Sequence, residues 1–148
     1  MPIAAEKPSV FLDADVLIAG SFSTTGASHR ILRLAELGLI DAVSSAQARE
    51  EAERNLRSKL PSGFPAFSAL VGAAVRWVRE PSVEELERSR DQADEKDVPI
   101  LAAAIAAGCS TLITLNVRDY RPLAGSIAVD KPGDFVRRLR EQLAKMAE

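Results

Sequence analysis

The sequence is poor in cysteine, histidine and aromatic residues, and each shortage argues against a class of protein. The single cysteine, Cys109, cannot form a disulfide within the chain, which argues against a disulfide-stabilised secreted domain and fits a reducing compartment. The single histidine, His29, lies in the wrong stretch for a Ser–His or Cys–His catalytic arrangement. Only seven aromatic residues, five Phe with one Trp and one Tyr, favour an alanine- and leucine-rich α/β protein over an all-β one.

The chain also lacks a segment of the kind that crosses a membrane. The longest apolar run, from Val98 to Cys109, is interrupted by Pro99 and is far shorter than a bilayer span. The N-terminus has no basic region followed by an apolar stretch. We therefore expect a soluble, cytoplasmic protein that does not associate with a membrane.

Two phosphate-binding fingerprints are absent as well. The sequence has neither G-x-x-x-x-G-K-[ST] nor G-x-G-x-x-G, which argues against a nucleotide-hydrolysing or dinucleotide-binding domain. With 19 basic and 21 acidic side chains the net charge is −2, so the global charge does not indicate a nucleic-acid binder. A chain of 148 residues is long enough for one ordinary domain and too short for two, so we expect residues 1–148 to form one domain.

Short apolar runs alternate with helical patterns along the chain. Apolar, β-branched runs that end in polar residues are typical of buried parallel strands, and amphipathic segments bounded by serine, proline or glycine are typical of helices. This alternation predicts an α/β fold, a three-layer α/β/α sandwich with a mainly parallel central sheet. The expected strands cover 9–12, 39–43, 75–78, 111–115 and 127–129, and the main helices cover 46–59, 66–74, 83–90, 97–108 and the segment from Pro132 onward.

The segment from Asp94 to Tyr120 joins acidic residues to two core elements. Its apolar spacing predicts a helix that begins near Asp97, where this side chain is placed to cap free amides, and ends near Gly108 in a left-handed cap. The strand that follows ends abruptly in Asn116 and Asp119. Because ligands of open parallel sheets bind outside the carboxyl ends of the strands, this polar cluster is a candidate site.

Two carboxylates follow the first strand. Either Asp13 and Asp15 both belong to the strand and lie on one side of it, or the strand ends at Asp13 and Asp15 caps the helical turn that follows. We adopt the second arrangement, with Asp13 as the functional group. On the next long helix, Glu51 and Glu53 flank a thin apolar stripe, so either of them can reach a neighbouring site.

We expect these acids to converge at one carboxyl edge of the sheet. Three or more carboxylates in one pocket repel each other and raise one another's pKa unless a cation neutralises them. Oxygen ligands without a His or Cys cluster select Mg²⁺ or Mn²⁺ over zinc. Sites of this kind commonly catalyse phosphoryl transfer. The candidate site residues are Asp13, Glu51, Asp97, Asn116 and Asp119.

At this point the chain resembles the PIN domain family, the metal-dependent ribonuclease fold that includes the VapC-like toxins of bacterial toxin–antitoxin pairs. The matching segments are FLDADVLI, SSAQAREEAERNL and DVPILAAAIAAGCSTLITLNVRDY, in this order along nearly the whole chain. The first segment alone is a weak signal. Its combination with the last segment is fairly specific.

The resemblance implies a set of roles. Asp13, Glu51 and Asp97 would bind Mg²⁺ or Mn²⁺, and Asn116 falls on a fourth metal-binding position, where many members have Asp. That ligand is then neutral, or its role passes to Asp119, and the loss of one charge should weaken a second metal site more than the first. Two further residues, Thr114 and Asp15, would orient the ligands.

The family resemblance also implies a reaction and partners. The reaction is hydrolysis of RNA phosphodiester bonds by water that the metal activates, which leaves 5′-phosphate and 3′-hydroxyl ends. The implied partners are an RNA substrate, a cognate antitoxin that lays a peptide across the acidic pocket, and a second copy of the chain in a homodimer.

Two alternatives remain open. The D-A-D-V sequence that begins at Asp13 also describes a haloacid-dehalogenase-like phosphatase, with Asp13 as a covalent nucleophile and Asp15 as an acid/base. That family also expects a late paired-acid motif, which residues 116–119 match poorly. The second alternative is a PIN-like interaction module that has lost full metal binding, a reading motivated by Asn116 and the acidic net charge.

Overall fold

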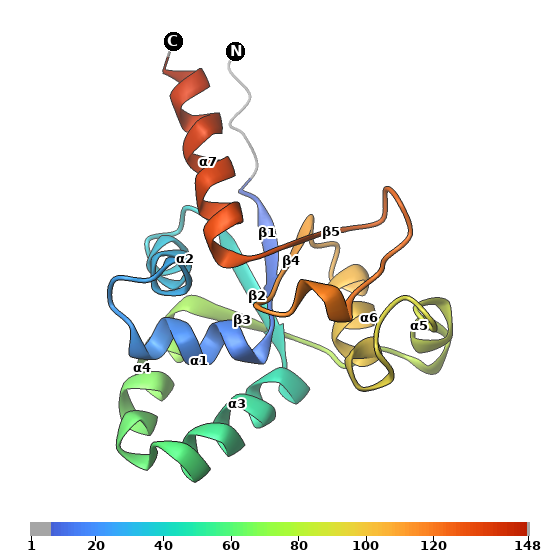
Figure 1. Cartoon of the computed structure of the whole chain (residues 1–148), viewed down its shortest axis with the longest axis horizontal. Helices are drawn as coiled ribbons and strands as arrows, with labels where there is room; N and C mark the ends of the chain where they lie inside the picture. The colour runs from blue at the N-terminus through green and yellow to red at the C-terminus, as the bar shows by residue number, and fades with distance from the viewer. Residues whose placement is uncertain (1–6, 148) are drawn as a thin grey trace.

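Strand β1 (Ser9–Leu12) is the middle strand of a five-stranded sheet (Figure 1). The structure is a computed structural model, which describes residues 7–147. The strand order is β3-β2-β1-β4-β5, and every neighbouring pair is parallel. The predicted α/β fold with a mainly parallel sheet is confirmed. The other strands are β2 (Asp41–Ser45), β3 (Val75–Val78), β4 (Thr111–Ile113) and β5 (Ala128–Asp130).

Strand β2 lies two residues later in the chain than predicted. Gly38 has a positive φ of 81°, and Leu39, which the pattern placed in the strand, is exposed. Strand pairing starts only at Asp41, whose carboxylate forms an ion pair with Arg76 of β3 at 2.8 Å. The prediction of a strand over 39–43 was wrong, because the ion pair with Arg76 stabilises an aspartate as the first residue of the strand.

Helices cover both faces of the sheet (Figure 1). One group, α1, α2, α3, α4 and α7, packs together on one face, while α5 packs on α6 against the other face. Within residues 7–147, no helix is both long and apolar enough to cross a membrane. The helix bounds are α1 (Ala14–Phe22), α2 (Ala27–Glu36), α3 (Ala46–Lys59), α4 (Phe64–Ala74), α5 (Val83–Arg88), α6 (Val98–Ala106) and α7 (Pro132–Met146), and three short 3₁₀ turns are η1 (Pro61–Gly63), η2 (Glu95–Asp97) and η3 (Val117–Asp119).

The strand order reverses at β1. After β1 the chain moves outward to β2 and β3, and the crossover through α5 and α6 then returns it to β4 on the other side of β1. In open parallel sheets, ligands bind in the crevice at the carboxyl ends where the order reverses. Leu12 of β1 lies opposite Ile113 of β4, so the residues that follow these two strands are brought together.

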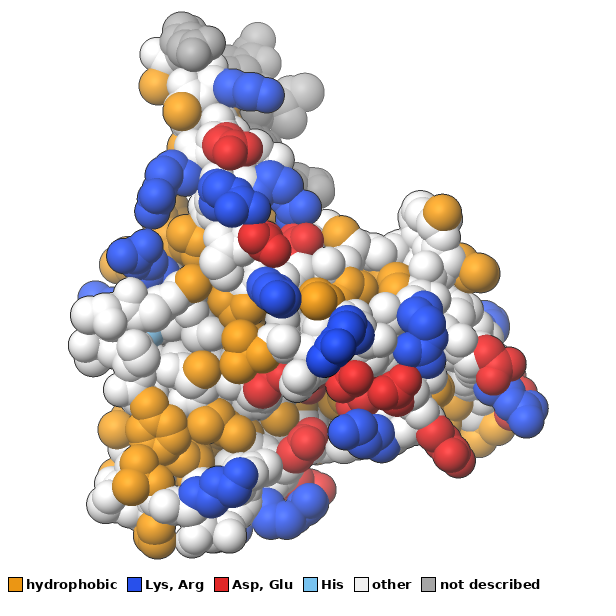
Figure 2. Space-filling view, in the orientation of Figure 1, with side chains coloured by type: hydrophobic (Ala, Val, Ile, Leu, Met, Phe, Trp, Pro, Cys, Tyr) orange, Lys and Arg blue, Asp and Glu red, His pale blue; other side chains and the backbone are white. Residues whose placement is uncertain are grey.

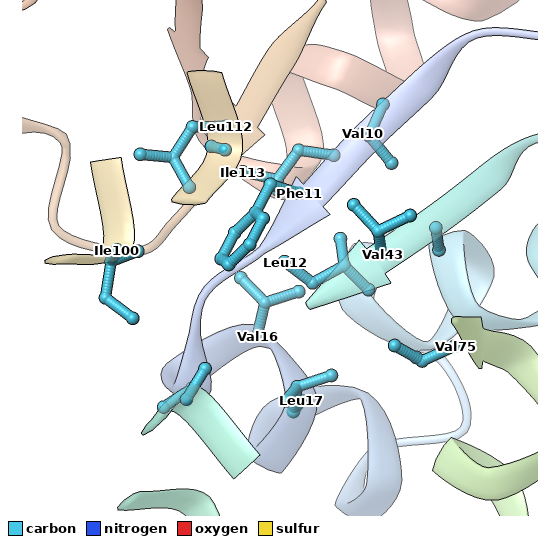
Figure 3. Packing of buried hydrophobic residues seen from close by; sticks show 14 of the residues in the cluster. Val10, Phe11, Leu12, Val16, Leu17, Val43, Val75, Ile100, Leu112 and Ile113 are labelled. Atoms are coloured by element: carbon cyan, nitrogen blue, oxygen red, sulfur yellow. The ribbon is translucent and has the colours of Figure 1, made fainter. Parts of the chain in front are cut away.

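The core fixes these strand ends from both sides. Val10, Phe11 and Leu12 of β1 are fully buried, as expected for a central strand that is covered on both faces. In Figure 3, Phe11 lies on the side of Ile100 from α6, whereas Leu12 lies near Val16 and Leu17 of α1. Removing a side chain such as Phe11 would cost about 3 to 5 kcal/mol. The strand ends therefore form a rigid base for the side chains beyond them.

Helix α6 ends in the left-handed cap that the sequence predicted. Gly108 has a φ of 75°, its N–H donates to the carbonyl of Ile105 at 3.0 Å, and the N–H of Cys109 donates to the carbonyl of Ala104 at 3.2 Å. These two hydrogen bonds form a Schellman motif, which satisfies carbonyls at the helix end. The motif turns the chain directly into β4.

Candidate metal centre

Asp13 lies at the junction of β1 and α1. Its backbone N–H donates to the carbonyl of Ile113 at 3.0 Å, and its Oδ1 accepts a hydrogen bond from the N–H of Ala14 at 2.8 Å. Asp13 is therefore the N-cap of α1. The prediction that Asp15 caps this helix was wrong, because the chain enters the helix two residues earlier. The Asp13 side chain is buried.

Two hydroxyl groups bind the other oxygen of Asp13. The Tyr120 hydroxyl donates to Oδ2 at 2.7 Å, and Thr114 Oγ1 donates to the same oxygen at 3.0 Å. Both donors are buried. Burial, followed by the negative charge of Asp13, raises the pKa of Tyr120 above its ordinary value, so the hydroxyl keeps its proton.

Asp15 reaches the segment that follows β4. Its Oδ2 accepts hydrogen bonds from Asn116 Nδ2 at 3.0 Å and from the N–H of Leu115 at 3.2 Å, and Thr114 Oγ1 lies 3.4 Å away. Its Oδ1 is buried without a hydrogen-bond partner in the described part of the chain. Burial, followed by the charge of Asp13, raises the pKa of Asp15 to about 6. The side-chain amide of Asn116 is thus engaged with Asp15.

Three more carboxylates form the open part of the centre. One oxygen from each of Asp94, Asp97 and Asp119 lies within 4.8 Å of the other two. Backbone contacts hold these loops together, since the N–H of Asp94 donates to the carbonyl of Asp119 at 2.8 Å and an antiparallel bridge pairs Ala93 with Tyr120. Of the two residues predicted after β4, Asp119 belongs to this group, whereas Asn116 lies beside Asp15.

Asp97 is the acid of this group with a buried oxygen that lacks a hydrogen-bond partner among the described residues. It occupies the N-cap position of α6, but its side chain makes no capping hydrogen bond to the described helix, so the prediction that it caps free amides was wrong. The buried oxygen is its Oδ2. Burial first, then the charges of Asp13, Asp119 and Glu51, raise the pKa of Asp97 to about 6, and Lys96 opposes them. These acids therefore act on one another electrostatically.

Helix α3 brings a further acid toward the centre. Glu51 is exposed, and its charge contributes to the raised pKa of Asp97. Glu53 instead pairs with Arg49 at 2.9 Å and with Arg57 at 3.7 Å. Of the two glutamates predicted to reach the site, Glu51 is the one whose charge acts there.

Two residues of the centre, Asp94 and Tyr120, were not among the candidates from the sequence. One signal for Asp94 was present: it lies three residues before Asp97, and a 3₁₀ turn places residues three apart on the same side. No comparable signal marks Tyr120. Its role depends on the contact between β1 and the loop after β4.

The donor set suits a hard divalent cation. It consists of carboxylate oxygens, which hard cations prefer. A positive charge at this place would bind the buried Oδ2 of Asp97, which has no partner among the described residues, and would offset the mutual repulsion of the acids. By their mutual distances, the residues that fit such an ion are Asp94, Asp97 and Asp119, and the charges of Asp13 and of Glu51 from α3 act on Asp97.

Basic side chains surround these acids. Figure 2 shows Lys and Arg side chains next to the acidic ones on this face of the molecule. Arg121 forms an ion pair with Asp94 at 3.0 Å. Lys96 and Arg118 are exposed, and each directly precedes an acid of the cluster. A negatively charged substrate can therefore approach the acids beside positive charge.

Comparisons with known proteins show the family of this chain and proteins of similar fold. A profile of the PIN domain family matches residues 9–118. One similar structure is that of VapBC2 from Rickettsia felis, bound to a DNA fragment from the promoter of VapBC2. Its TM-score is 0.58 at 13% identity, and the match covers 83% of this chain and 98% of that chain. PAE2754 from Pyrobaculum aerophilum has a TM-score of 0.62 at 15% identity, covering 88% of each chain. No curated protein matches the sequence significantly.

Proposed function

Because the chain belongs to the PIN domain family, we propose that it is a metal-dependent endoribonuclease that hydrolyses RNA phosphodiester bonds and acts as the toxin of a toxin–antitoxin pair. One observation supports this proposal most. Acids follow β1 and β4 at the edge where the strand order reverses, their charges act on Asp97 at the start of α6, and a buried oxygen of Asp97 lacks a partner in the described chain. Such a site is suited to a cation and to the phosphate that the cation binds.

The acidic residues of the centre would bind the metal ion, and the ion would supply part of the chemistry. Bound Mg²⁺ or Mn²⁺ supplies activation of water and neutralises charge on the phosphate. Asp13, Asp97 and Glu51 hold the ion, together with Asp94. We propose that Asp119, rather than Asn116, takes the fourth position, because Asp119 lies in the carboxylate group.

The remaining residues align this set and receive the substrate. Thr114 orients Asp13, and Asn116 orients Asp15 through the hydrogen bonds described above. Lys96 and Arg118 attract the phosphate backbone of RNA, which carries a negative charge at every nucleotide.

Cleavage of a labelled single-stranded RNA panel in Mn²⁺, Mg²⁺ or EDTA tests the nuclease. We expect cutting that needs the metal and is abolished in Asp13→Asn and Asp97→Asn, because each variant removes a charged ligand. Glu51→Gln should also lose activity. Its neighbour Glu50 is exposed on the same helix and outside the cluster, so Glu50→Gln is the matched control and should cut as the wild type does.

Other outcomes would select the alternatives. RNA or protein binding without cleavage and without Mn²⁺ uptake in calorimetry would favour the interaction module. A phosphoaspartate trapped on Asp13 would favour the phosphatase.

The toxin assignment and the partners have their own tests. The similar fold of a VapBC complex motivates a cognate antitoxin that places a basic side chain among the acids. We expect expression of the chain to arrest bacterial growth and Asp97→Asn to relieve the arrest; arrest by both would contradict a nuclease toxin. We also propose a homodimer, which a monomeric mass in light scattering would exclude.

A further inference from the structure

The Tyr120 side chain lies where two parts of the metal centre meet. One part, Asp13 and Asp15, follows β1. The other part is carried by the loops around η2 and η3. The backbone of Tyr120 belongs to the second part through its bridge with Ala93, while its hydroxyl reaches the first part, 2.7 Å from Asp13 Oδ2. A single buried residue therefore contacts both.

Thr114 is the weaker of the two donors to Asp13. A hydroxyl group has one hydrogen. Thr114 Oγ1 lies 3.0 Å from Asp13 Oδ2 and 3.4 Å from Asp15 Oδ2, so two carboxylates compete for it. The Tyr120 hydroxyl donates to Asp13 at the shorter distance of 2.7 Å. Tyr120 is therefore the more constant restraint on this carboxylate.

A tyrosine suits this place because it donates without adding charge. A lysine or arginine would cancel the negative charge that attracts a cation, whereas the protonated phenol leaves that charge in place. With Oδ2 held by hydroxyls and Oδ1 bonded to the N–H of Ala14, the Asp13 side chain is fixed in one orientation. The remaining lone pair of Oδ1 is then free for a cation.

We propose that Tyr120 is a positioning residue that fixes the Asp13 carboxylate for cation binding and aligns it with the acids on η2 and η3. This inference rests on the metal centre of the proposed function. Phenylalanine has the same ring without the hydroxyl, so Tyr120→Phe tests the donor separately from the packing.

Titration calorimetry with Mn²⁺ on the full chain tests the proposal without a cleavage assay. We expect Tyr120→Phe to raise the Kd for Mn²⁺ by about tenfold or more, the usual effect of removing a group that orients a ligand. Ser44→Ala is the matched control. Ser44 is also buried at the strand ends, but its hydroxyl donates to the carbonyl of Leu12 at 2.7 Å, so its loss should leave the Kd unchanged.

The outcomes separate this inference from the proposed function. No Mn²⁺ binding by the wild type would remove the metal centre and the nuclease together. Wild-type binding with an unchanged Kd in Tyr120→Phe, or an equal rise in Ser44→Ala, would overturn the role of Tyr120 alone. Should Tyr120→Phe fail to fold, Thr114→Val removes the other donor to the same oxygen. That variant keeps the Tyr120 hydroxyl on Asp13, so its Kd should rise by much less than tenfold, and a tenfold or larger rise would overturn Tyr120 as the main restraint on Asp13.

Discussion

At the scale of single residues, Asp97 and Asp15 make the metal-free protein less stable at neutral pH. Both carboxyls have a pKa of about 6 in the folded chain, against an ordinary value of 3.8. Between these two values the folded state binds more protons than the unfolded state. The contribution of these groups to the free energy of unfolding therefore falls as pH rises from about 4 to about 6, and stays low above that range.

Asp97→Asn should reverse part of this loss. In EDTA at pH 7 we expect the variant to be more stable than the wild type by on the order of 1 kcal/mol, less than the full pKa shift implies because the group is partly solvated. The difference should shrink toward zero near pH 4, where the wild-type carboxyl is protonated. Urea unfolding across this pH range measures it.

Added Mn²⁺ provides the counterpart to this experiment. The ion should stabilise the wild type more at pH 7 than at pH 5, and it should stabilise Asp97→Asn much less, because a ligand is lost. A variant that is less stable than the wild type in EDTA at every pH would contradict this account of Asp97.

Single residues were also where sequence reasoning reached its limit. Asp13 and Asp97 were identified because Asp13 directly follows β1 and Asp97 directly precedes α6, and Asp119 because it lies in the polar segment after β4. Asp94 was missed although its spacing from Asp97 was a local signal, because its contact with the loop of Asp119 joins segments that are distant in sequence. The contact of the Asn116 amide with Asp15, which joins segments about a hundred residues apart, was likewise not predicted from the sequence.

At the scale of elements, the turn at the end of α6 sets the entry into β4. Gly108→Ala should destabilise the protein by about 1 kcal/mol, because the residue has a φ of 75° and alanine is strained there. An added Cβ would meet no described atom within 4 Å, so the cost belongs to the backbone alone. Urea unfolding measures the loss, and Mn²⁺ affinity should not change, since Asp97 lies at the other end of the helix.

Gly72 offers the matched control for this prediction. It lies inside α4 with a similarly open surrounding and without a positive φ, so Gly72→Ala should stabilise the protein by about 0.5 kcal/mol. Equal effects of the two substitutions would show that backbone conformation does not account for the role of Gly108.

Most elements could be predicted because their signals are local. Helix α3 begins after Ser45, which caps it, and has the bounds that were predicted, as does β3. Strand β2 was misplaced because its start depends on the ion pair of Asp41 with another strand. A strand boundary that depends on a contact with another element cannot be predicted from the sequence of that strand alone.

At the scale of the whole molecule, charge is distributed in a way that the net value conceals. The chain carries −2 overall, yet Lys96 and Arg118 lie beside the acids. In an Asp13→Asn background, which prevents cutting, Lys96→Ala and Arg118→Ala should each lower the slope of log affinity for single-stranded RNA against log salt by about 0.7. Fluorescence anisotropy at several salt concentrations measures this slope.

Lys145 is the matched control for these lysine and arginine variants. It lies in the last turn of α7, whose C-terminal end Figure 1 shows projecting away from the sheet and from α6. Lys145→Ala should leave the slope unchanged. An equal decrease of the slope in all three variants would mean that the affinity for RNA depends on the total charge of the protein and not on the positive charges beside the acids.

The pairing of β1 with β4 has a consequence for the synthesis of the protein. Asp13 is made early, but its donors Thr114 and Tyr120 lie 101 and 107 residues later in the chain. Ribosomes synthesise a chain from its N-terminus, so Asp13 is present in the nascent chain long before Thr114 and Tyr120. Until these donors are made, Asp13 is not positioned to bind a cation. For the proposed ribonuclease, this order keeps the growing chain inactive until the segment from Thr114 to Tyr120 has been made and has paired with β1.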